Sequence, residues 1–109
     1  MKQRDEIKNL VSQILRAFRP EKIILFGSHA YGKPGRDSDI DVMVIMSTRK
    51  NTLVAAADIR KAIEHDYPMD IIVRTPAQVR QRLKWGDSFI TQVMAKGKIL
   101  YEAPDQRMD

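Results

Sequence analysis

The sequence contains no cysteine and no long apolar run. Without thiols the chain can form no disulfide, no thiolate metal site and no cysteine-based catalytic site. Its apolar runs hold only a few residues each, and the charged N-terminus MKQRDEIKNL is unlike a secretory signal. We therefore expect no membrane anchor and a cytoplasmic location. The chain also lacks internal repeats, linkers and low-complexity segments.

What is present is typical of one small soluble domain. The 109 residues are 43% hydrophobic and 30% charged, which is ordinary usage for a globular protein. We expect a single domain over residues 1–109, too small for a catalytic domain and a separate substrate-binding domain. Nineteen Lys and Arg against fourteen Asp and Glu give a net charge of +5. This balance favours an anionic partner, such as a nucleotide, nucleic acid or an acidic protein, without choosing among them.

The spacing of apolar residues predicts alternating helices and strands. The predicted segments are a helix over 3–18, strands over 23–26 and 39–46, a helix over 53–63, and strands over 69–74 and 98–102. The first strand is apolar throughout, which is typical of a strand buried on both faces. Turn-forming residues over 32–38 predict a loop, and residues 103–109 are expected to fray. The sum is a small α/β domain with a short central sheet.

Helix caps predict two further helices near the C-terminus. Thr75, Pro76 and Gln78 combine a cap, a proline at the first helical position and a residue placed to close a capping box. Asp87 or Ser88 can cap a second helix, with Gly97 as its stop.

Three carboxylates on predicted strands suggest a metal site. Asp39 and Asp41 are two residues apart on one strand, so their side chains point from the same face. Like charges that close repel each other unless they are protonated, solvated or neutralised by a cation, and Mg²⁺ prefers such oxygen ligands. Asp70 interrupts a third apolar strand. Three such acids could hold two metal ions that clamp the attacking and leaving oxygens of a phosphoryl displacement.

Gly27 and Ser28 directly follow the first predicted strand and suggest a phosphate site. If a short helix begins there, its N–H groups and its dipole can bind phosphate. Gly27 would let the backbone approach the ligand closely, and the Ser28 hydroxyl adds a donor.

The ordered combination of these residues resembles a known family. A strand, Gly27-Ser28, a ten-residue gap, Asp39-Ile40-Asp41 and a later strand acid at Asp70 are similar to the nucleotidyltransferase signature of the DNA polymerase beta superfamily. The fuller string GSHAYGKPGRDSDIDVMVI, with VRTPAQV and KGKILYE, resembles its smallest branch, the minimal nucleotidyltransferases. The resemblance covers nearly the whole chain from about residue 20 and implies a polymerase-beta-like fold with a small mixed sheet flanked by helices.

The resemblance implies a role for each motif residue. Asp39 and Asp41 would ligate Mg²⁺, with two ions expected. Asp70 would join this metal set and either hold the acceptor hydroxyl or assist its deprotonation. Gly27 and Ser28 would bind the triphosphate of ATP. Many members carry arginine where this chain has Tyr31, and Lys33 or Arg36 would then supply the missing phosphate contact.

The resemblance also implies a reaction and a partner. Transfer of a nucleoside monophosphate, AMP from ATP, to a partner protein's hydroxyl would release pyrophosphate. Proteins of this branch are typically encoded beside a small helical HEPN protein, as antitoxin and toxin. Two alternatives stay open: a non-catalytic antitoxin that occludes its HEPN partner, and a nucleotidyltransferase acting on a small molecule, which would need a homo-oligomer or an added domain to complete its pocket. Sequence-specific DNA binding has only the net charge in its favour.

Overall fold

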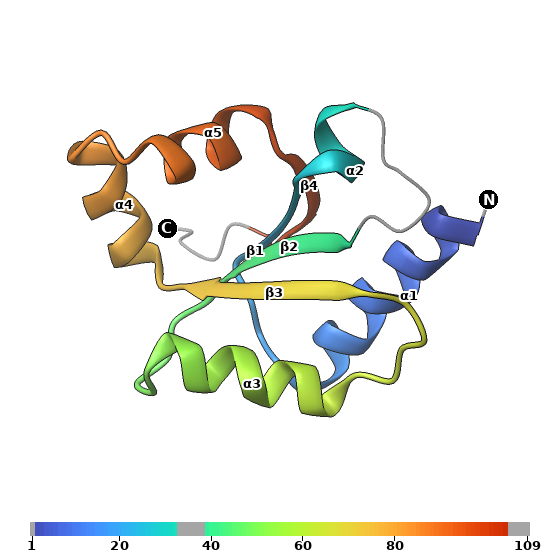
Figure 1. Ribbon diagram of the computed structural model, residues 1–109. Helices are drawn as coiled ribbons and strands as arrows, with labels where there is room; N and C mark the ends of the chain where they lie inside the picture. The colour runs from blue at the N-terminus through green and yellow to red at the C-terminus, as the bar shows by residue number, and fades with distance from the viewer. Residues whose placement is uncertain (1, 33–38, 105–109) are drawn as a thin grey trace.

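Helices and strands alternate along the chain in the order expected from the sequence. The computed structural model describes residues 2–32 and 39–104 (Figure 1). Within these residues the elements are, in chain order, α1 (Lys2–Ala17), β1 (Lys22–Phe26), α2 (Ser28–Tyr31), β2 (Ile40–Ile45), α3 (Thr52–Ala62), β3 (Met69–Arg74), α4 (Pro76–Lys84), α5 (Ser88–Lys96) and β4 (Lys98–Glu102). The expected α/β fold class, with a mixed sheet flanked by helices, is confirmed.

The observed bounds correct several ends of the predicted elements. α1 ends at Ala17, although the Phe18 N–H still donates to the Ile14 carbonyl at 2.9 Å. β2 is one residue shorter at each end than the predicted strand, because Asp39 and Met46 have no partner in the pairing register of the sheet. At the predicted frayed tail, the Ala103 N–H donates to the Glu21 carbonyl at 2.8 Å, so the chain is held one residue beyond β4.

The four strands of the described residues form one mixed sheet in the order β3-β2-β1-β4. β1 is antiparallel to both of its neighbours, β2 and β4. β2 and β3 are parallel, and α3 makes the crossover between them. Parallel neighbours require such a crossover, which explains why a helix separates these two strands in the sequence.

Helices cover both faces of the sheet. α1 and α3 lie on one face, and α4 and α5 lie on the other (Figure 1). β1 alternates between the two cores, with Ile23 and Leu25 in the first and Ile24 and Phe26 in the second. This confirms that the strand over 23–26 is buried on both faces. No helix in the described ranges is long and apolar enough to cross a membrane.

The caps of α4 and α5 follow the sequence closely. The Gln78 N–H donates to Thr75 Oγ1 at 3.1 Å, and the Thr75 N–H donates to Gln78 Oε1 at 2.9 Å. The predicted capping box is therefore present. Of the two candidate caps for α5, Asp87 is the one used, since its Oδ1 accepts from the Ile90 N–H at 2.9 Å. Gly97 ends α5 as expected.

Candidate active site

A row of three side chains crosses the sheet on the α4 and α5 face. Phe26 on β1 is the register partner of Asp41 on β2, and Asp41 is in turn the register partner of Asp70 on β3. Register partners point to the same face, and neighbouring strands lie roughly 5 Å apart. The chain thus brings two acids that are far apart in sequence directly beside each other.

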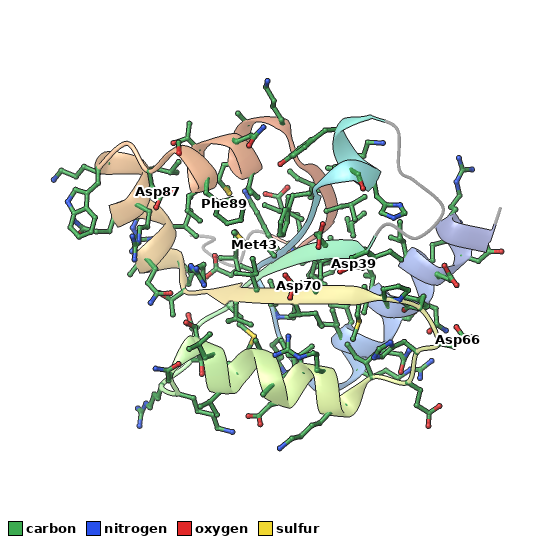
Figure 2. The ribbon with its side chains drawn as sticks, viewed as in Figure 1. Asp39, Met43, Asp66, Asp70, Asp87 and Phe89 are labelled. Atoms are coloured by element: carbon green, nitrogen blue, oxygen red, sulfur yellow. The ribbon has the colours of Figure 1, made fainter. Side chains whose placement is uncertain are left out.

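Asp39 is a third carboxylate near Asp41 and Asp70, and we call these three residues the row of acids, or the row. Asp39 precedes the first residue of β2, while Asp70 lies on the neighbouring strand β3 (Figure 2). Both of these side chains are exposed, whereas Asp41 between them is half-buried. The row therefore has an accessible side that faces solvent and a more sheltered acid at its centre.

Burial and neighbouring charges both favour the protonated form of the central acid. Burial raises the pKa of Asp41, and the charges of Asp70 and Asp39 raise it further. His29 on α2 opposes this rise. Repulsion between carboxylates and loss of solvation both favour a bound cation at this position.

Gly27 lies directly against the central acid. Its φ of 76° is in the left-handed region that favours glycine. A Cβ built on Gly27 would overlap Asp41 Oδ2 and would lie 3.2 Å from Asp41 Cγ. The absence of a side chain at residue 27 therefore makes room for the Asp41 carboxylate. We expected Gly27 to serve the close approach of a ligand, and the sequence did not indicate this contact with Asp41.

The predicted helix after Gly27 is present but is only one turn long. α2 spans Ser28–Tyr31, and the N–H groups of Ala30 and Tyr31 both donate to the Gly27 carbonyl at 3.0 Å. Because the helix dipole is the sum of aligned peptide dipoles, one turn contributes little to it. Any phosphate bound here would depend on the local Gly27-Ser28 backbone and the Ser28 hydroxyl. The two predicted phosphate-binding cations, Lys33 and Arg36, lie outside the described residues.

The donor set of the row fits a divalent cation held in an open site. Among residues 2–32 and 39–104, no three His, Cys, Asp or Glu side chains form a group that could hold a metal ion by themselves. Mg²⁺ in phosphoryl-transfer sites is usually held by one or two carboxylates and completes its coordination with water and substrate phosphates. Asp41 and its neighbouring acids match such a site better than a closed cage.

Two aromatic rings next to the row were not singled out from the sequence. The Phe26 and Phe89 ring centroids are 5.4 Å apart with an interplanar angle of 83°, an edge-to-face pair. This contact joins α5 to the end of β1 from which Gly27 follows (Figure 2). The only feature of the sequence that could have placed Phe26 near the site is its position directly before Gly27. The effect of His29 on Asp41 was likewise not predicted from the sequence.

Comparison with known protein families identifies this chain as a nucleotidyltransferase. The sequence profile of the nucleotidyltransferase domain family matches residues 4–101, so the chain belongs to this family. Its members use a nucleoside triphosphate and a divalent metal ion. The predicted enzyme class, a nucleotidyltransferase, is confirmed.

Two relatives illustrate the similarity. The chain is 26% identical over 103 residues to a protein of Methanocaldococcus jannaschii whose name gives protein adenylyltransferase as a provisional activity. That alignment covers 93% of this chain and all of the relative. The fold is also similar to a chain in a crystal structure of a mutant of the toxin–antitoxin MntA-HpeT, with a TM-score of 0.51 and 21% identity. This match covers 94% of our chain and 75% of the other, and it shows the fold.

Proposed function

We propose that this nucleotidyltransferase transfers AMP from ATP to a hydroxyl group of a partner protein. The observation that carries the proposal is the row in which Asp41 and Asp70 are register partners and Gly27 leaves room for the Asp41 carboxylate. The provisional activity of the Methanocaldococcus jannaschii relative supports a protein acceptor. Because Asp39 and Asp70 are exposed, a hydroxyl on another protein can reach the row from solvent.

The reaction needs a base, a site for the triphosphate and charge neutralisation. The acceptor oxygen forms a bond to the α-phosphorus, the bond from that phosphorus to the oxygen bridging toward the β-phosphorus breaks, and pyrophosphate leaves. Asp39 and Asp41 would hold Mg²⁺, with two ions and with Asp70 as a further ligand. When bound, Mg²⁺ neutralises the charge on the triphosphate and on the departing pyrophosphate.

The remaining roles fall to groups around the row. Asp70 orients the acceptor hydroxyl and takes its proton, since it is exposed and lies beside Asp41. The Gly27-Ser28 backbone and the Ser28 hydroxyl bind the triphosphate. Lys33 and Arg36 follow α2 in the sequence and add cationic phosphate contacts.

We further propose that the chain is the antitoxin of a toxin–antitoxin pair and that its acceptor is a HEPN-family toxin. The similar fold in the MntA-HpeT toxin–antitoxin structure supports this pairing. The partner would then supply the acceptor surface itself.

Mass spectrometry of the partner tests this function. The purified chain is incubated with ATP, Mg²⁺ and the protein encoded by the neighbouring gene, which is then weighed. We expect one or more added AMP groups with the wild-type chain and none with Asp39→Ala/Asp41→Ala. Asp5→Ala/Asp66→Ala removes two exposed acids from elsewhere on the surface and serves as the control of matched charge. An unmodified partner with wild type, or full modification with the first double variant, contradicts the proposal.

A second candidate function is neutralisation of the partner by binding alone. The observation in its favour is that the described residues contain no complete group of three metal-holding side chains. Toxicity assays separate the two functions. Persistent neutralisation by Asp39→Ala/Asp41→Ala supports occlusion, and loss of neutralisation together with loss of AMP transfer supports catalysis.

A further inference from the structure

A large hollow lies between α1 and the edge strand β4, separate from the row of acids. Its volume is about 770 Å³. The apolar part of its lining comes from Ile7 and Val11 on α1, Leu25 on β1, and Leu100 on β4. Leu25 belongs to the core on the α1 and α3 face, whereas the row of acids lies on the opposite face of the sheet. We call this hollow the α1–β4 groove.

The polar part of the groove lining carries one sign of charge. Arg4 and Lys8 stand one turn apart on α1, and Lys98 begins β4. All three side chains are exposed, and no carboxylate is found among the described residues that line the groove. None of the three cations forms an ion pair within the described part of the chain. The groove is therefore an apolar channel with a basic rim that has no ion-pair partner among the described residues.

The wall formed by β4 is open to another protein. In the described sheet β4 is the last strand and pairs with β1 alone. An exposed strand edge beside apolar side chains is a surface on which partner segments commonly dock.

The α1–β4 groove extends to α2, the short helix that follows Gly27. His29 on α2 lines it, and the same side chain acts electrostatically on Asp41. Leu25 in the groove is two residues before Gly27, the residue that lies against Asp41. A segment bound along the groove would therefore reach α2, whose His29 acts on Asp41.

We propose that the α1–β4 groove docks an acidic segment of the acceptor protein, one that carries apolar side chains between Asp or Glu residues. The choice of occupant rests on charge complementarity: apolar side chains would fill the channel and carboxylates would pair with Arg4, Lys8 and Lys98. This inference rests on the proposed function, because it identifies where the protein acceptor is held while its hydroxyl reaches Asp70. It makes the groove the part of the chain that selects the acceptor.

Charge reversal in the groove tests the proposal. The dissociation constant for the partner encoded by the neighbouring gene is measured by calorimetry with wild type, Arg4→Glu/Lys8→Glu and Arg80→Glu/Lys84→Glu. The second pair is the matched control, since both of its residues are exposed, stand one turn apart on α4 and change the net charge by the same amount. We expect binding to weaken roughly tenfold or more with the groove variant, because like charges across an interface are strongly unfavourable. The control is expected to bind like wild type.

Two further measurements keep the outcomes separate. The thermal shift caused by ATP and Mg²⁺ should be the same in the groove variant and in wild type, which shows that the variant is folded and retains its nucleotide site. A photo-crosslinking residue introduced at Ser12, an exposed residue of α1 that lines the groove, should join the partner through a peptide rich in Asp or Glu.

Several results would overturn the inference. Unchanged partner binding by Arg4→Glu/Lys8→Glu excludes the groove, and an equal loss in the α4 control shows that only net charge matters. A crosslinked peptide rich in Lys or Arg, or no partner binding by the wild-type chain, also contradicts it. If wild type binds through the groove but transfers no AMP, the proposed function fails and the docking surface stands.

Discussion

The contact between Gly27 and Asp41 links the backbone of one strand end to the acid at the centre of the site. Two separate requirements fall on residue 27: a φ of 76° and space for the Asp41 carboxylate. Gly86 offers a useful comparison, since its φ is 77° but a Cβ built on it would meet no atom within 4 Å. Both glycines have a positive φ, but only Gly27 must also leave space for a neighbouring side chain.

We predict that Gly27→Ala abolishes most of the activity, whereas Gly86→Ala retains it. Both variants should lose roughly 1–2 kcal/mol of stability, because alanine is strained at positive φ. Only Gly27→Ala should also displace the Asp41 carboxylate, and a misplacement of about 1 Å can lower a rate about a hundredfold. Urea denaturation and the rate of AMP transfer measure the two effects. Equal activities of the two variants would show that the contact with Asp41 has no catalytic importance.

Tyr67 gives a prediction about stability at high pH. Burial raises the pKa of Tyr67, and the nearby charges of Glu6 and Asp66 raise it further. The folded state therefore holds the phenol proton more tightly than the unfolded state does. The resulting stability is fully present below the ordinary tyrosine pKa of about 10 and is lost as the pH rises from there through the raised pKa of the folded state.

We expect the melting temperature of wild type to fall more steeply above about pH 10 than that of Tyr67→Phe. At pH 8 the two proteins should differ by less than about 1 kcal/mol, since the hydrogen bond from the Tyr67 hydroxyl to the Glu6 carbonyl is long, at 3.4 Å. Thermal melts from pH 8 to pH 11 provide the comparison. Parallel curves over this range would exclude Tyr67 as a source of alkaline sensitivity.

At the scale of the elements, Gly97 shows why a correct prediction can have the wrong reason. We expected Gly97 to end α5, and glycine commonly ends helices because it can adopt positive φ. The helix does end there, but Gly97 has a φ of −66°, which any residue can adopt. A Cβ at this position would lie 2.5 Å from Ile24 Cγ2 and 2.5 Å from the Val93 carbonyl oxygen. Glycine is required for close packing between α5 and β1.

We predict that Gly97→Ala destabilises the protein by about 1–3 kcal/mol, the range of overpacked core positions. Because its backbone conformation suits alanine, the whole loss should come from the steric contacts with β1 and α5. Lys96→Ala, at the neighbouring exposed residue, should stay within about 0.5 kcal/mol of wild type. Denaturant midpoints measure the stability of the two variants and of wild type. An unchanged midpoint for Gly97→Ala would contradict the close packing.

The elements were more predictable than their pairing. Apolar periodicity and caps are local signals, so the helices and strands were found within a residue or two of their observed bounds, including the Thr75 capping box. Strand order and register depend on contacts between distant segments and leave no local signal. The sequence placed Asp39 and Asp41 on one face, but only the parallel pairing of β2 with β3 puts Asp70 beside Asp41. The α1–β4 groove arises in the same way and could not be foreseen.

Over the whole molecule, charge is divided between two places. The acids of the row repel each other around Asp41, and the basic rim of the α1–β4 groove carries Arg4, Lys8 and Lys98. The net charge of +5 is a sum over the whole chain and does not reveal either surface, because the charges of these acids and these bases cancel. Ligands of opposite charge should stabilise the fold through different residues.

We predict that ATP with Mg²⁺ raises the melting temperature more than ATP with EDTA. A ligand that binds only the folded state must stabilise it, by about 2.7 kcal/mol when present at a hundred times its dissociation constant. The part of the shift that depends on Mg²⁺ should disappear in Asp39→Ala/Asp41→Ala and persist in Asp5→Ala/Asp66→Ala. Equal shifts with Mg²⁺ and with EDTA, measured by differential scanning fluorimetry, would count against a metal site in the row.

The closeness of residue 27 to the carboxylate of Asp41 also constrains how this protein can evolve. A mutation that adds a side chain at residue 27 must push the acid away, and it becomes tolerable once the acid has been lost or replaced by a smaller residue. A change at residue 27 is therefore expected only after the acid at residue 41 has changed. A relative with any residue other than glycine at the position of Gly27 is thus expected to be a pseudoenzyme, recognisable from that one substitution, in which only a binding role is still under selection.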